Sequence, residues 1–332
     1  MTRYILNRIL MLIPVLLGVM LVVFIFQAIS PDDPARMLLG YGATEEQVEA
    51  MQVKLGLDQP IAVQYVRYVW NLIRYGDLGT SYSSGQPVLS EIMVRFPITL
   101  RLAVISVFVG VLIGVPLGIL SAVKQYSWVD NAILGFSVFI SSFPGFWLAL
   151  LLIVLFSVRL GWLPSMGIID WKGWIMPTVV IALGTMTMLI RNTRASMLEA
   201  IRQDYVRMAR AKGQSENKII YGHVLRNSMI PIVNTISITI GGQLGGALII
   251  ESVFGIAGIG MYALTAIGTR NYPAVLGSVV VLAFTFTVIN LLVDVCYAII
   301  DPKLRITFVA SSKARKLRRM ARKRAKAARA AY

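Results

Sequence analysis

The sequence has little charge for its length and almost no cysteine or histidine. Only 14% of its 332 residues are charged, and 57% are hydrophobic, with a mean hydropathy of +0.71. Soluble domains carry about 25% charged residues, so this composition excludes an ordinary water-soluble domain and favours a protein embedded in a bilayer. The single cysteine, Cys296, excludes an intramolecular disulfide. The single histidine, His223, does not make a metal site by itself, because such a site needs several ligands.

Two signatures of enzymes are also absent. The sequence contains no GxxxxGK[ST] phosphate-binding loop, which excludes the usual ATP site. The apolar runs contain no cluster of histidine, cysteine and carboxylate residues, so a membrane-embedded enzyme is disfavoured. The formal net charge is +16, but the basic residues lie in loops and at one end of the chain. Membrane topology explains that placement better than nucleic-acid binding does, and we expect no nucleic acid partner.

Six apolar runs are each about long enough to cross a bilayer, at roughly 20 residues per crossing. They cover residues 9–29, 99–123, 132–155, 174–189, 232–250 and 274–300. No A-x-A cleavage site follows the first run, so we interpret it as an uncleaved span rather than a signal peptide. We therefore expect an all-α membrane protein with six transmembrane helices. The expected divisions are a first helix (1–30), an extracytoplasmic subdomain (31–96), a transmembrane domain (97–301) and a basic cytosolic tail (302–332).

The placement of the basic residues predicts the orientation. If the N-terminus lies inside, 23 of the 32 lysine and arginine residues fall on the cytoplasmic side, in segments 1–8, 124–131, 191–230 and 303–332. This agrees with the positive-inside rule, so both termini are predicted to be cytoplasmic in a multi-pass protein of the cell membrane. The last segment carries twelve basic residues and no acidic residue. We expect it to lie near anionic lipid headgroups, and contact with RNA is the alternative.

Residues 31–96 differ from the rest of the chain in their nearly balanced charge. Thr44 is placed to cap a helix that runs to about Leu55, with Glu46 in its first turn. The stretch 64–75 is amphipathic and aromatic. We interpret this region as a small extracytoplasmic subdomain that contacts a soluble partner. A solvated loop is the alternative.

Small residues recur at helical spacing in the second span. Gly110, Gly114 and Gly118 lie four residues apart, a pattern that lets helices approach closely in lipid. In the third span, Ser141, Ser142 and Pro144 interrupt the apolar run. A break at this depth is tolerated where it lines a water-filled path, so these residues are candidates for a translocation pathway, and a simple kink is an equal alternative.

Two acidic residues lie in or beside the last spans. Acids within membrane spans are functional candidates by default. Asp294 lies inside the sixth span, and we expect it to form a pair or to line the pathway. Glu251 lies at the end of the fifth span, where we expect it to be reached by water.

A polar stretch, residues 191–230, separates the fourth and fifth spans. One face of a predicted helix over 198–212 is formed by Leu198, Ile201, Tyr205 and Met208. Gly213 is suited to end that helix, and Ser215 to begin a second, short helix over 214–222. Such a helix, presented to the cytosol between two spans, is placed to transmit a push from a soluble partner. An ordinary interfacial loop is the alternative.

The polar stretch also carries an ordered set of residues, namely Ala209-Arg210-Ala211-Lys212-Gly213, Ser215, Ile219, His223-Val224-Leu225-Arg226-Asn227 and Pro231. This order resembles the EAA loop of ABC importer permeases and is most similar to that of dipeptide, oligopeptide and nickel importers. Further matches at 4–19, 55–60, 76–81, 96–100, 251–260, 290–294 and 301–302 extend the resemblance to nearly the whole chain. Arg207 and Met208 depart from it, because they stand where the family often has Glu-Ala.

The resemblance implies the architecture of a type I ABC importer permease with a cytosolic coupling helix. It implies a non-catalytic subunit that binds no cofactor, while two cytosolic ATPase subunits use ATP and Mg. The other implied partners are a homologous second permease, an extracytoplasmic substrate-binding protein and the lipid bilayer. The implied ATPase-coupling residues are Tyr205, Arg207, Ala209, Ala211, Gly213, Ser215, Glu216, Lys218, Ile219, His223, Leu225, Asn227 and Pro231.

Short peptides are the substrate that the resemblance implies. Nickel or another small solute is the alternative within the same family, because the binding protein does much of the selection. A secondary transporter that needs no ATPase is a further alternative, but the sequence contains no inverted repeat to support it.

Overall fold

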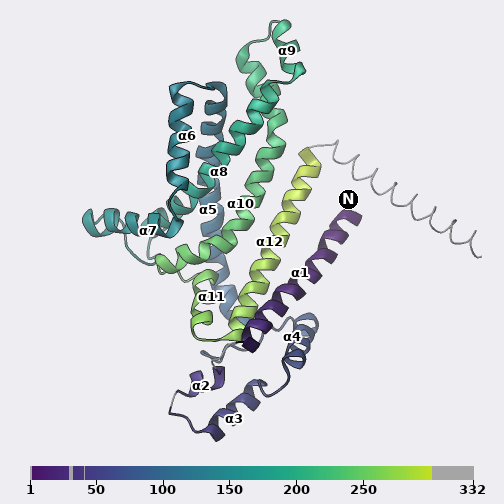
Figure 1. The fold of residues 1–332 in the computed structure, drawn as a ribbon, viewed down its shortest axis with the longest axis vertical. Helices are drawn as coiled ribbons and strands as arrows, with labels where there is room; N and C mark the ends of the chain where they lie inside the picture. The colour runs from purple at the N-terminus through teal and green to yellow at the C-terminus, as the bar shows by residue number, and fades with distance from the viewer. Residues whose placement is uncertain (1, 30–32, 41, 301–332) are drawn as a thin grey trace, which may run out of the picture. The chain divides into compact units, whose positions relative to one another are not determined.

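The computed structural model describes residues 2–29, 33–40 and 42–300 (Figure 1). Within these residues the chain is helical apart from its loops and one isolated antiparallel bridge between Thr80 and Pro87. Residues 1–289 form one compact unit and residues 290–332 a second. The predicted basic tail, 302–332, lies outside the described residues.

The helices follow one another along the chain with short connections. They are α1 (Thr2–Ile29), α2 (Pro34–Leu39), α3 (Glu45–Leu55), α4 (Ile61–Tyr75), α5 (Val88–Val123), α6 (Trp128–Ser141), α7 (Gly145–Leu152), α8 (Ile175–Ile201), α9 (Asp204–Ala211), α10 (Leu225–Val253), α11 (Ile259–Gly268) and α12 (Tyr272–Ile300). Two π-helical segments, η1 (Ile153–Arg159) and η3 (Lys218–Val224), continue α7 and lead into α10, and a 3-10 turn, η2 (Trp171–Trp174), precedes α8.

Each predicted apolar run falls within one of these helices or within a bent pair of them. Among the described residues, three helices are long and apolar enough to cross a membrane, Val88–Val123, Trp171–Ile201 and Tyr272–Leu292. The number rises to five if two bent pairs each make one span. These pairs are Trp128–Ser141 with Gly145–Arg159, bent by 94°, and Lys218–Gln243 with Ala247–Val253, bent by 48°. The first predicted run lies in α1, with an apolar part at Ile13–Gln27.

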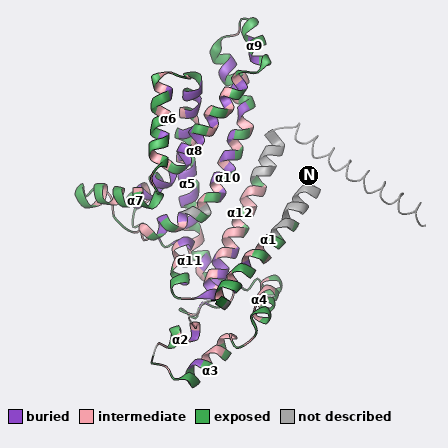
Figure 2. Ribbon diagram, in the orientation of Figure 1, coloured by how far each residue is buried: buried purple, intermediate pink, exposed green. Residues whose placement is uncertain are grey.

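The close approach of α5 and α8 confirms the packing face predicted from the glycine spacing. A Cβ added at Gly114 would lie 2.9 Å from the carbonyl oxygen of Met186, and one at Gly118 would lie 2.6 Å from the Cβ of Thr193. Both contacts are too short for any larger residue. The three glycines are buried, and Figure 2 shows that buried residues concentrate along α5 and α8. This helix pair is the central contact of the first unit.

The expectation that water reaches Glu251 is wrong, because the side chain is fully buried. Its carboxylate accepts a hydrogen bond from Thr99 Oγ1 at 2.6 Å and from the backbone N–H of Met261 at 3.2 Å. Thr99 Oγ1 in turn accepts from the N–H of Ile259 at 2.9 Å. An anion is stabilised at the N-terminal end of a helix, so Glu251 joins the end of α10 to the start of α11 and to α5.

Helix α11 lies between the predicted runs 232–250 and 274–300, in a glycine-containing segment where the sequence predicted no helix. The glycines serve close packing instead. A Cβ at Gly258 would overlap the carboxylate of Glu251, and a Cβ at Gly260 would lie 2.5 Å from the Cα of Leu248. A short helix can therefore fold back directly on α10, and its glycines mark a tight contact rather than an open loop.

The segment before α5 is anchored by one buried amide. The side chain of Asn271, in the turn between α11 and α12, accepts from the N–H of Tyr82 at 3.0 Å and donates to the hydroxyls of Ser81 and Ser83 at 2.8 and 3.0 Å.

The predicted cap at Thr44 is confirmed, because its hydroxyl and the side chain of Gln47 form a reciprocal capping box at the start of α3.

The α5–α8 contact generates the first prediction. Gly114→Val forces a side chain into a space bounded by backbone atoms, so we expect it to destabilise the protein by about 1–3 kcal/mol. The matched control is Gly135→Val on α6, where an added Cβ meets nothing within 4 Å. Each variant is heated in detergent, and its melting temperature is taken from the loss of the monodisperse peak in size-exclusion chromatography. The melting temperature should fall for Gly114→Val only. An equal effect of both variants would contradict the tight contact.

Candidate coupling site

The polar stretch folds around α9, a short helix set off from its neighbours by two breaks. Helix α8 ends at Ile201, and the chain turns at Arg202 and Gln203. The backbone of Gln203 is extended (φ −74°, ψ 152°). After α9, Gly213 adopts a left-handed conformation with φ +71°, which glycine takes without strain. Figure 1 shows α9 at one end of α8 and α10.

Two details of the sequence prediction are wrong here. Residues 198–212 do not form one helix, because the chain breaks before Asp204. Residues 214–222 do not form a separate short helix, because helical structure runs from Glu216 through η3 into α10. The separate helix is α9, which precedes the glycine. A break of two residues leaves the apolar spacing nearly unchanged, so periodicity alone could not reveal it.

One face of α9 is held against the helix ends by apolar packing. Val206 is fully buried and Ala209 nearly so. They belong to a cluster that also contains Ile119, Ala122, Met197, Ala200, Ile219, Ile220 and Val224. These residues come from α5, α8 and η3, so the position of α9 is fixed by three different elements.

The opposite face of α9 is exposed and mixes apolar and basic side chains. Met208 is 59% and Tyr205 37% exposed, and the Arg207 side chain is 76% exposed. Arg210 donates to the Glu216 carboxylate at 2.7 Å across the Gly213 turn. This hydrogen bond lowers the pKa of the Glu216 carboxyl. The face therefore presents an apolar centre with charged edges, which suits a protein partner.

The lone histidine belongs to the same turn. His223 Nε2 lies 2.9 Å from Gln214 Oε1, and its backbone carbonyl accepts a hydrogen bond from Asn227 Nδ2 at 2.8 Å. Ser228 donates to the carbonyl of Ser196 at 3.2 Å and so links α10 to α8. These contacts indicate a structural role for His223, which joins the Gly213 turn to the start of α10. Among the described residues, no group of three histidine, cysteine or acidic residues could hold a metal ion.

A buried ion pair lies beside this site. Asp130, at the start of α6, is 1% exposed and accepts two hydrogen bonds from the Arg194 guanidinium, at 2.8 and 2.7 Å. It also accepts from the hydroxyl of Ser121 and from the N–H of Tyr126. The carboxylate thus joins the end of α5, the α5–α6 turn and α8. Sequence reasoning missed this pair, because Asp130 and Arg194 lie 64 positions apart and no local pattern connects them.

The structure gathers the predicted coupling residues at this end of the bundle. Tyr205, Arg207, Ala209 and Ala211 lie on α9, Gly213 and Ser215 lie in the turn, and Glu216, Lys218, Ile219, His223, Leu225, Asn227 and Pro231 follow along η3 and α10. Ala209 and Ile219 are buried, His223 and Leu225 are half-buried, and the others are exposed. Two apolar residues of α9 were not among the predicted coupling residues. Val206 is buried and Met208 is exposed.

The candidate pathway residues lie apart from α9. Ser141, Ser142 and Pro144 are exposed at the 94° bend between α6 and α7. Arg191 of α8 donates to the Ser141 hydroxyl at 3.3 Å. Asp294 falls within α12, but its side chain lies outside what the structure describes. The structure therefore brings together the coupling set, and it places Ser141, Ser142 and Pro144 together at one bend.

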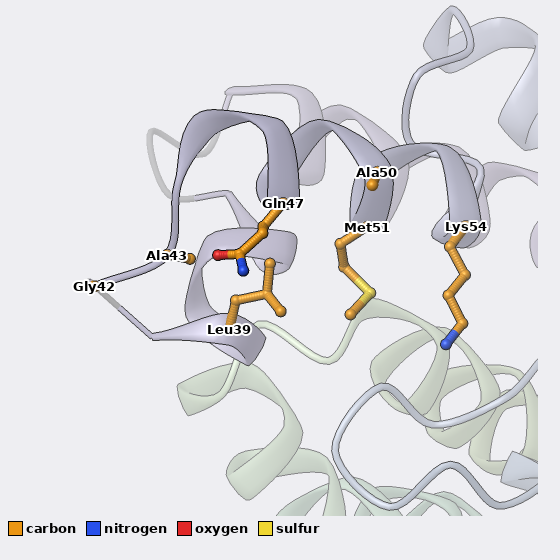
Figure 3. Close-up of a pocket in the computed structure, with 7 residues that line it drawn as sticks. All are labelled: Leu39, Gly42, Ala43, Gln47, Ala50, Met51 and Lys54. Atoms are coloured by element: carbon orange, nitrogen blue, oxygen red, sulfur yellow. The ribbon is translucent and has the colours of Figure 1, made fainter.

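A shallow pocket of about 480 Å³ lies between α2 and α3. Figure 3 shows Leu39 of α2 facing Gln47 of α3, with Met51 and Lys54 projecting on the same side of α3. The floor of this pocket is mostly apolar, and Lys54 lies at its edge.

Solved structures define the class of fold. The inward-facing MetNI methionine ABC transporter aligns with a TM-score of 0.54 at 21% identity, over 64% of this chain and 97% of that chain. A crystal structure of an amino acid ABC transporter with histidines aligns with a TM-score of 0.50 at 16% identity, over 65% of this chain and 94% of that chain. The fold is that of a type I ABC importer permease.

Sequence comparison then gives the family. The model of the binding-protein-dependent transport system inner membrane component matches residues 114–306, and that of its N-terminal part matches residues 1–103. A putative peptide transport system permease protein of Brucella abortus strain 2308 is 39% identical, over 92% of this chain and 99% of its own length. The glutathione transport system permease protein GsiC of Salmonella paratyphi A is 40% identical over the same shares. The chain belongs to the family of binding-protein-dependent transport system inner membrane components. It is an inner-membrane permease.

The Asp130–Arg194 pair generates the second prediction. Arg194→Leu leaves the Asp130 carboxylate buried without its counter-charge, so we expect a loss of about 3 kcal/mol in stability. Adding Asp130→Asn removes that charge but keeps an acceptor for Ser121 and Tyr126, and should restore more than half of the loss.

The matched control is Arg191→Leu, an exposed arginine on the same helix, which should change the melting temperature little. Unfolding in detergent measures all three variants. If the double variant is less stable than Arg194→Leu alone, the loss in Arg194→Leu does not come from an unpaired buried charge on Asp130.

Proposed function

We propose that the chain is the non-catalytic permease subunit of an ATP-driven importer, and that α9 is its coupling helix. The observation that carries the proposal is the division of α9 into two faces. Its buried face is fixed by α5, α8 and η3, while its exposed face carries Tyr205, Arg207 and Met208, none of which belongs to an apolar cluster of the described residues. A helix held in this way can pass a displacement from a cytosolic partner to several membrane helices at once.

The proposed partners are two cytosolic ATPase subunits, a homologous second permease and an extracytoplasmic binding protein. The ATPase subunits use ATP and Mg, because this sequence has no phosphate-binding loop of its own. Closure of these subunits on ATP moves the α9 helices and switches the pathway between its inward-facing and outward-facing states. Arg210, Glu216 and Gly213 set the angle between α9 and η3 in this movement.

Orientation follows from the same assignment. With α9 in the cytosol, the N-terminus and the basic tail lie on the cytoplasmic side, in agreement with the distribution of basic residues. Residues 31–96 then form the extracytoplasmic region. The pocket between α2 and α3 is the contact we propose for the binding protein, because it is a hollow with an apolar floor on this side of the membrane (Figure 3).

Short peptides are the proposed substrate. Two of the curated relatives are named for peptide and glutathione transport, at 39% and 40% identity over 92% of this chain. The bend at Ser141, Ser142 and Pro144 is the proposed part of the pathway that this chain supplies, together with Asp294. Nickel or another small solute is the second candidate substrate, on the strength of the resemblance alone.

The third prediction tests α9. Met208→Glu places a charge in the apolar centre of the exposed face and leaves the buried face intact, so the protein should fold and insert normally. Co-purification of ATPase subunits from native membranes should fall about tenfold or more, as expected for a buried interface anchor. ATP-dependent uptake of a labelled dipeptide into vesicles should fall with it.

Val53→Glu on α3 is the control, because it makes the same chemical change at a side chain that is 64% exposed far from α9. It should leave ATPase binding unchanged. Normal ATPase recovery with Met208→Glu would overturn the coupling role of α9. Uptake that survives ATP depletion would overturn the importer itself in favour of a secondary transporter.

A further inference from the structure

Helix α4 has more apolar surface than its partner helix covers. Its residues divide into three faces, each stepping by three or four positions. One face packs on α1 and consists of Tyr65, Tyr68, Val69 and Leu72. A second face is polar and consists of Gln64, Arg67, Asn71 and Arg74. The third is apolar and consists of Val63, Val66, Trp70 and Ile73, which we call the outer stripe.

Among the residues that the structure describes, none buries the outer stripe. Its side chains are 43%, 64%, 57% and 73% exposed, in chain order. No residue of α4 is buried, and Figure 2 shows the helix as exposed and intermediate throughout. A surface helix in water normally keeps a single apolar stripe for its core and is polar elsewhere. In α4 only about a third of the circumference is polar, so the composition does not suit a helix surrounded by water.

Contacts with α1 place α4 at membrane depth. Tyr65 donates its hydroxyl to the carbonyl of Leu17 at 3.1 Å, and the side chains of Gln27 and Gln64 are hydrogen-bonded at 3.3 Å. Phe24 contacts the rings of Tyr65 and Tyr68 edge-on. Leu17 lies within the apolar part of α1, about 18 Å along the helix from its end at Ile29. The hydrocarbon layer is about 30 Å thick, so the contacts with α4 extend from near the end of α1, at Gln27, to about the middle of the layer, at Leu17.

The edges of the outer stripe have the chemistry of a lipid interface. The Arg74 guanidinium lies 5.7 Å from the centre of the Trp70 ring and 5.5 Å from that of Tyr75. Tryptophan and tyrosine favour the level of the headgroups, and arginine binds their phosphates. Helices that lie in the interface combine an apolar face carrying tryptophan with a polar face carrying arginine. The α4 helix has both.

We propose that α4 is an interfacial helix whose outer stripe inserts into the outer leaflet of the bilayer. In this arrangement Arg67 and Arg74 face the phosphates. Residues 31–96 are then not a free extracytoplasmic subdomain. They are tied to the membrane surface at α4, and only α2 and α3 stand clear of it.

Spin-label accessibility in the assembled transporter tests this. Cys296→Ser removes the native thiol, and single cysteines are then introduced as Val66→Cys, Trp70→Cys or Ile73→Cys. After nitroxide labelling and reconstitution into nanodiscs of phosphatidylglycerol and phosphatidylethanolamine, collisions are measured with dissolved oxygen and with a water-soluble nickel chelate. Val53→Cys on α3, which is 64% exposed, is the matched control.

We expect the three α4 labels to collide with oxygen at least threefold more than with the chelate, and the α3 label to show the reverse. High collision rates with the chelate at the α4 positions would show that the outer stripe faces water, which overturns the proposal. Low collision rates with both reagents would show that a protein covers it, such as the second permease, and would overturn it equally. Because the readout does not involve transport or ATP, failure here is distinguishable from failure of the coupling role of α9.

Discussion

The close approach of α5 and α8 is the contact on which the rest of the structure depends. Where no water is present, helices associate by packing, and small residues bring their backbones together. Gly110, Gly114 and Gly118 do this along the middle of the pair. Each end of the pair then carries an apolar cluster that holds a different part of the chain. At one end the cluster holds α9 and η3, and at the other it holds the end of α10 and the segment after it. One close helix contact thus connects the α9 site to the opposite end of the bundle.

The two buried carboxylates inside this bundle are each satisfied by neighbouring polar groups, as a membrane environment requires of a charge. Asp130 uses Arg194, Ser121 and a backbone N–H at the α9 end, and Glu251 uses Thr99 and the start of α11 at the other end. Each carboxylate joins three segments of chain that apolar packing alone would leave free to slide. Direction changes occur elsewhere, at the 94° bend between α6 and α7 and at the break before α9.

The sequence predicted the features that depend on local chemistry and missed those that depend on contacts distant in the chain. The apolar runs, the cap at Thr44, the glycine face of α5 and the left-handed Gly213 were all visible, because each follows from a residue and its near neighbours. The burial of Glu251 was not visible, since its partner Thr99 lies 152 positions away. The helix α11 was hidden because glycine indicates both loops and tight packing. The break before α9 was hidden because it preserves the apolar spacing.

The two faces of α9 also explain where the sequence departs from the family pattern. Arg207 and Met208 replace the residues that often stand in the EAA loop, and both are exposed, so packing against the described residues does not fix their identity. Ala209 keeps the pattern and is 8% exposed against the helix ends, where a larger side chain has no room without moving α9. Gly213 also keeps the family pattern, because its backbone has φ +71°, a left-handed conformation that favours glycine. The fold therefore fixes the buried positions of the loop and its left-handed glycine, and leaves the exposed positions to be set by the surface that α9 meets.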